Sequence, residues 1–114
     1  SGPAGLTAAI YAGRSARSVL VLGGPVPGGP MMLSRAVENF PAVGAKTGAE
    51  LMADLVGQAK SFGAKFKHGS AVKLYPTVQG QSGPVSGITH FGTEMGDGTL
   101  VRSRSVIVAT GAKE

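Results

Sequence analysis

The chain has 114 residues, 42% of them hydrophobic, and a formal net charge of +5. This length suits one domain with a modest core, and no apolar run reaches the roughly 20 residues that a membrane-spanning helix needs. The absence of cysteine excludes disulfides and thiolate zinc sites within these residues. The N-terminus lacks the charged and apolar zones of a signal peptide, so we expect a soluble, cytoplasmic protein without a membrane partner.

The positive charge raises the question of nucleic-acid binding, but its distribution argues against it. The eleven Lys and Arg residues are spread along the chain without a run. The densest groupings, Lys65 with Lys67 and Arg102 with Arg104, fall on alternate positions of expected strands, which is typical of a solvated face. Only 5% of the residues are aromatic, too few for a platform on which bases stack. We therefore expect no nucleic-acid partner and a charge that helps to attract anionic cofactors.

The first fourteen residues have the pattern of the second half of a dinucleotide-binding turn, Gly-x-Gly-x-x-Gly, followed by a helix. Gly2 and Gly5 correspond to its second and third glycines, and the first glycine with its strand would precede Ser1. A missing side chain at Gly2 lets a pyrophosphate approach the backbone, and Gly5 allows the helix to pack close to a sheet. Pro3 suits the first helical turn, where free N–H groups and the dipole favour a phosphate. The alternative is a capped amphipathic helix with no ligand, because such a fragment is weak evidence by itself.

A strand and a long loop are expected next. Residues 19–22, Val-Leu-Val-Leu, are typical of a strand buried on both faces of a parallel sheet. An acidic residue usually ends this strand and binds the ribose hydroxyls, but Gly23 and Gly24 occupy that place here. Residues 23–46 are rich in glycine and proline, so we expect a functional loop without long regular elements. In this loop Asn39 offers an amide donor and acceptor to a cofactor, or alternatively bonds to the backbone of its own turn.

The remaining residues predict a second helix and several short strands. Thr47 and Glu50 have capping-box spacing, and the apolar periodicity extends the helix to about Phe62. Strands are expected at residues 64–68 and 70–75, followed by a polar turn over 75–84.

The last third of the chain predicts an antiparallel meander and one more buried strand. A hairpin at residues 96–98 would join strands at 85–93 and 100–103, giving a meander inserted in the parallel sheet. The Val-Ile-Val run at 106–108 is expected to be a buried strand that leads into small residues at 109–112. His68 and His90 are isolated from other ligand-type residues, so we expect no metal site and no catalytic residue in this chain.

Four stretches together resemble the low-molecular-weight thioredoxin reductases, a family of flavoprotein disulfide reductases. They are VLVL at residues 19–22, GGPMM at 28–32, VENFP at 37–41 and VIVATGA at 106–112, in addition to the opening turn. The resemblance implies an α/β, Rossmann-like three-layer FAD-binding fold with the inserted meander and without its first strand. Residues 1–114 would be a single partial FAD-binding domain, with the NADPH domain and the C-terminal FAD segment lying outside the chain.

The same resemblance implies which residues hold FAD. The pyrophosphate would lie on the opening turn. The Gly28–Gly29 pair and the Asn39 amide would orient the flavin side. The backbone at Val72 would touch the adenine, and the final turn would close over the flavin. These residues are Gly2, Pro3, Ala4, Gly5, Gly28, Gly29, Asn39, Val72, Thr110, Gly111 and Ala112.

The resemblance also implies a function for the larger enzyme. It would pass electrons from NADPH through FAD to a cysteine pair and then to thioredoxin or a similar disulfide substrate, and a homodimer is among the assemblies it allows. This chain has no Cys-x-x-Cys pair and would not be competent alone. Two alternatives stay open: a non-catalytic fragment or binding module of the same origin, and part of a ferredoxin-NADP reductase of thioredoxin-reductase type.

Overall fold

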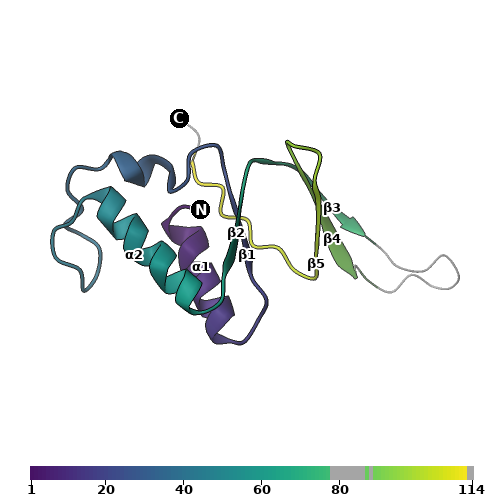
Figure 1. Cartoon of the computed structure of the whole chain (residues 1–114), viewed down its shortest axis with the longest axis horizontal. Helices are drawn as coiled ribbons and strands as arrows, with labels where there is room; N and C mark the ends of the chain where they lie inside the picture. The colour runs from purple at the N-terminus through teal and green to yellow at the C-terminus, as the bar shows by residue number, and fades with distance from the viewer. Residues whose placement is uncertain (78–86, 88, 113–114) are drawn as a thin grey trace, which may run out of the picture.

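The computed structural model describes residues 1–77, 87 and 89–112, and its elements are arranged in three layers (Figure 1). Two helices, α1 (Pro3–Arg14) and α2 (Gly48–Ser61), form the first layer. A parallel pair of strands, β1 (Leu20–Gly23) and β2 (Lys65–His68), forms the second. No helix in this described part is long and apolar enough to cross a membrane.

The third layer is an antiparallel sheet of β3 (Ala71–Thr77), β4 (His90–Met95) and β5 (Leu100–Ser103), paired in that order. The expected α/β three-layer architecture with an antiparallel meander is therefore confirmed. The meander is, however, a sheet of its own and not an insertion within the parallel sheet. Residues 75–77, expected in a turn, extend β3 instead, whereas residues 78–86 and 88 of the expected turn and strand lie outside the described residues.

Both helices form where local sequence signals predicted them. Thr47 is the N-cap of α2 and exchanges hydrogen bonds with Glu50: the Glu50 N–H donates to Thr47 Oγ1 over 3.2 Å, and the Thr47 N–H donates to Glu50 Oε2 over 2.8 Å. Helix α1 packs closely on α2, because a Cβ atom on Gly13 would lie only 2.6 Å from the carbonyl oxygen of Phe62. The predicted capping box thus fixes the start of α2, and the close approach at Gly13 joins the two helices into one layer.

The hydrophobic core lies between the two helices and the parallel strands. It contains one buried stripe from each helix together with residues of β1 and the segments around it: Leu6, Ala9, Ile10, Val21, Val37, Leu51, Met52, Leu55, Ala59 and Ala64. The parallel register pairs Val21 with Phe66 and Gly23 with His68, so the carboxyl ends of β1 and β2 lie side by side. In α/β sheets ligands bind outside these strand ends, which makes this edge the place to look for a site.

The prediction of a buried strand at residues 106–108 was wrong. Ile107 is 66% exposed and Val108 68% exposed, and residues 104–112 belong to no strand. An aliphatic run is buried on both faces only where a neighbouring strand pairs with its backbone, but β1 pairs with β2, and β5 pairs with β4. Full burial of the β1 run is not observed either, since Leu20 is 42% exposed although β1 pairs with β2. The long loop contains one short element, the 3-10 helix η1 (Gly29–Leu33).

Candidate nucleotide-binding site

The start of α1 offers backbone donors without a side-chain acceptor. Gly2 is the N-cap residue, Pro3 is the first helical residue, and no side chain of the described residues caps this end of the helix. The first turn contains no acidic residue, so the positive end of the helix dipole is not neutralised within that turn. The N–H groups of Ala4 and Gly5, which have no intrahelical partner, are therefore available to an anion.

Gly2 has no structural reason to be a glycine. Its φ of −76° and ψ of −178° are accessible to any residue, and within the described part of the chain a Cβ atom there would meet no atom within 4 Å. Gly28 differs, because its φ is +87° and its Cβ would lie 2.6 Å from the Cγ of Met32. The fold itself thus requires Gly28, whereas the bare backbone of Gly2 leaves open space at the helix start.

Ser1, beside the start of α1, lies close to the end of β1 and to the long loop. The Gly28 N–H donates to Ser1 Oγ over 3.2 Å, and a Cβ on Gly23 would lie 3.5 Å from the same oxygen. A cavity of about 180 Å³ opens beside these residues at the carboxyl ends of β1 and β2. It is lined by Ser1, Gly23, Pro27, Gly28, Val56, Lys60, Phe66, Lys67 and His68.

The final turn, at residues 109–112, contacts the N-terminal end of α1. A Cβ on Gly5 would lie 3.5 Å from the Cβ of Ala109, so residues preceding Thr110 are in contact with the first helical turn. Figure 1 shows this segment passing the chain's N-terminus. Gly111 has a φ of +78° and thus makes the turn that a glycine permits, while Thr110 and Ala112 are exposed.

These observations agree with comparisons to known proteins. Residues 1–114 match the family described as pyridine nucleotide-disulphide oxidoreductase. The chain belongs to this family. It is 33% identical over 113 residues to a thioredoxin reductase of Listeria monocytogenes and 37% identical over 115 residues to one of Aquifex aeolicus, covering 99% and 100% of this chain. It spans only 32% of the length of each of these relatives.

Solved structures give the same result. The chain superposes on thioredoxin reductases of Streptococcus pyogenes and Lactococcus lactis with TM-scores of 0.84 and 0.83, at 31% and 29% identity. The match covers 99% and 100% of this chain and 33% and 34% of those chains. Residues 1–114 therefore correspond to the FAD-domain part of these reductases.

Of the eleven predicted site residues, only Gly28 lines the cavity. Asn39 is exposed in the long loop, and Val72 is 62% exposed on β3, and neither lines the cavity. Their contacts with a cofactor stay predictions. By contrast, the structure brings together Gly2, Gly5 and Gly28, through Ser1 and the start of α1.

Sequence reasoning missed the basic residues of the cavity. Lys60 comes from α2, and Lys67 and His68 end β2, where the parallel register pairs His68 with Gly23. Lys67 Nζ lies 3.3 Å from Asp97 Oδ2. Hydrogen bonds from the side chain and backbone of Thr99, with a smaller contribution from Lys67, lower the pKa of Asp97 to about 2. Asp97 thus stays ionised and forms an ion pair with Lys67.

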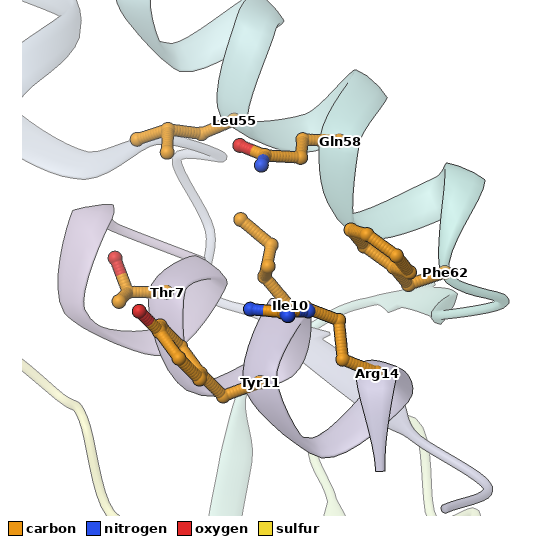
Figure 2. Close-up of a pocket in the computed structure, with 7 residues that line it drawn as sticks. All are labelled: Thr7, Ile10, Tyr11, Arg14, Leu55, Gln58 and Phe62. Atoms are coloured by element: carbon orange, nitrogen blue, oxygen red, sulfur yellow. The ribbon is translucent and has the colours of Figure 1, made fainter. Parts of the chain in front are cut away.

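A second hollow, of about 430 Å³, lies between the helices α1 and α2 (Figure 2). Side chains of the two helices face each other across it: Thr7, Ile10, Tyr11, Arg14, Leu55, Gln58 and Phe62. The Arg14 guanidinium lies 5.8 Å from the centre of the Tyr11 ring. None of the predicted cofactor residues lines this hollow, and it is formed by helices alone, so it is separate from the nucleotide-binding edge.

Proposed function

We propose that residues 1–114 form the FAD-binding part of a cytoplasmic, thioredoxin-reductase-like oxidoreductase. In this proposal the whole enzyme transfers electrons from NADPH through FAD to a disulfide of thioredoxin or a similar substrate, and a homodimer is an allowed assembly. The residues present fit a flavin dinucleotide, because the open backbone at Gly2 adjoins the strand ends where α/β folds bind nucleotides. This one feature carries the proposal.

The chain's own residues would bind and orient the cofactor. The N–H groups of Ala4 and Gly5 would donate to the pyrophosphate, and the positive end of the α1 dipole would favour its charge. Gly28 and Gly29 would let the loop pass close to the cofactor, and Asn39 would orient the flavin side. Thr110, Gly111 and Ala112 would close the site, since Ala109 already lies against Gly5.

FAD, when bound, supplies the electron-transfer chemistry, and the protein supplies position and electrostatics. The 114 residues contain no cysteine, so the redox-active pair that the proposal needs would come from outside them. None of these residues is assigned a catalytic role.

The test is a titration of the isotope-labelled chain with FAD, followed by NMR. The amide signals of Ala4, Gly5 and Gly28 are expected to shift together, while signals of β5 stay in place. Shifts confined to Tyr11, Gln58 and Phe62 would assign binding to the hollow between the helices and contradict the proposal. The same titration is made on a chain extended upstream by the strand that the proposal needs, in which unmoved amide signals of Ala4, Gly5 and Gly28 would contradict the proposal.

A further inference from the structure

The hollow between α1 and α2 has an apolar floor of fixed shape. Ile10 and Leu55, which are 6% and 8% exposed, belong to the hydrophobic core and also line the hollow. Phe62 adds an aromatic ring, and its backbone lies against Gly13, where a Cβ atom would be only 2.6 Å from the Phe62 carbonyl oxygen. Because this contact and the core hold both helices in place, the apolar surface is formed before a ligand arrives.

A single cation stands beside this apolar floor. The Arg14 guanidinium lies 5.8 Å from the centre of the Tyr11 ring, and no carboxylate oxygen of the described residues lies within 4.0 Å of it. In that part of the chain no Asp or Glu lines the hollow, and the carboxylate of Asp54 on α2 is paired with Lys46 instead. A guanidinium keeps its charge in proteins, so this end of the hollow attracts an anion.

Neutral polar groups complete the rim of the hollow. The Tyr11 hydroxyl comes from α1 and the Gln58 amide from α2, and both groups can donate hydrogen bonds (Figure 2). The Thr7 hydroxyl already donates to the Pro3 carbonyl over 2.8 Å, which leaves its oxygen as an acceptor. The donors on the rim thus suit the oxygens of a carboxylate held at Arg14.

We propose that the hollow binds a small organic carboxylate with an apolar ring or chain. The apolar part would lie on Ile10, Leu55 and Phe62, and the carboxylate would pair with the Arg14 guanidinium. The volume of about 430 Å³ falls within the roughly 300–1,000 Å³ of pockets that hold small ligands. This site goes beyond the nucleotide function, and because the two sites share no lining residue, neither proposal depends on the other.

The test compares 3-phenylpropionate with 3-phenylpropan-1-ol, which has the same ring and chain length but no charge. Both are titrated into the isotope-labelled chain at low ionic strength and followed by NMR. The acid is expected to shift the amide signals of Tyr11, Gln58 and Phe62 and to bind about threefold more tightly than the alcohol, since an exposed ion pair contributes modestly. This advantage should shrink in high salt, which screens the pair. Equal affinities of acid and alcohol, or unmoved signals at these three residues, would overturn the inference.

Two matched variants locate the charge. Arg14→Gln is expected to abolish the preference for the acid, whereas Arg17→Gln, also exposed but outside the hollow, is expected to keep it. A preference that survives Arg14→Gln unchanged would assign the carboxylate to another surface and overturn the inference. Dilution of the chain without ligand provides a further check: if the signals of Tyr11, Gln58 and Phe62 shift on dilution, a second copy covers this face, and the small-carboxylate site is wrong.

Discussion

A Cβ atom placed on Gly5 would lie 3.5 Å from the Cβ of Ala109, so the first turn of α1 and the segment at residues 109–112 touch. These two residues are more than one hundred positions apart, and both stretches were predicted to seat the same cofactor. Their contact brings the opening turn and the final turn together. It also sets how large a side chain position 5 can hold.

The contact predicts different outcomes for two substitutions of Gly5. A separation of 3.5 Å is an ordinary van der Waals distance, so Gly5→Ala fits and removes a flexible helical glycine, a gain of about 0.5–1 kcal/mol. Gly5→Leu overfills the contact and is expected to cost about 1–3 kcal/mol. Urea unfolding followed by circular dichroism measures both. If the leucine variant were as stable as the alanine variant, the contact with Ala109 would be wrong.

The packing of α1 on α2 predicts that Gly13→Ala is destabilising. The new Cβ would lie 2.6 Å from the Phe62 carbonyl oxygen and 2.9 Å from the Phe62 Cβ, so the helices must separate, at a cost of about 1–3 kcal/mol. Gly57→Ala on α2 is the matched control, because nothing lies within 4 Å of that Cβ. The control should gain about 0.5–1 kcal/mol in the same unfolding assay. Equal changes in both variants would refute the close helix packing.

The capping box of α2 predicts a moderate loss of stability for Thr47→Ala. The substitution removes the acceptor that the Glu50 N–H uses and leaves a helix start unsatisfied, which costs about 1 kcal/mol. Thr47→Ser keeps the hydroxyl and should stay close to the original midpoint of thermal unfolding. A serine variant as unstable as the alanine variant would show that the methyl group, and not the hydrogen bond, matters.

The hairpin between β4 and β5 predicts a pH dependence of stability. The pKa of Asp97 is about 2 in the folded chain, below its ordinary value of 3.8. A lowered folded pKa stabilises the fold above pH 3.8, and this contribution disappears as the pH falls towards 2. The stability difference between the original chain and Asp97→Asn should therefore shrink over that range when measured by urea unfolding at several pH values. A difference that stays constant down to pH 2 would contradict the hydrogen bonds assigned to Asp97.

The elements that local residues specify were predictable from the sequence. Helix α2 follows from the Thr47 and Glu50 pair and from apolar periodicity, both contained within the helix and its cap. The hairpin at residues 96–98 follows from its glycines. The buried strand expected at residues 106–108 failed because burial of an aliphatic run depends on which strands flank it, and the run itself does not encode its neighbours.

The candidate site was predictable only where one stretch forms it. The turn at Gly2 and Gly5 has a recognisable spacing, and its contact with a cofactor stays a prediction. Lys60 and His68 were missed because they come from separate elements, α2 and β2, that only the folded chain brings to one cavity. The available signal was Gly23, because an acidic residue that binds the ribose hydroxyls usually stands at this position. Its absence indicated that the contacts to the ribose would differ from the usual ones.

The most direct measurement is the affinity for FAD of a chain that is extended upstream by the strand the proposal needs and carries Gly2→Val, compared with the same extended chain carrying Gly44→Val. Neither new side chain meets an atom of the chain at its Cβ, so both variants should fold, which circular dichroism checks. A valine at position 2 blocks the approach of the pyrophosphate to the backbone and is expected to weaken FAD binding at least about tenfold, whereas valine at position 44, in the exposed loop, should leave it unchanged. Undiminished FAD binding by a folded Gly2→Val chain would contradict the account.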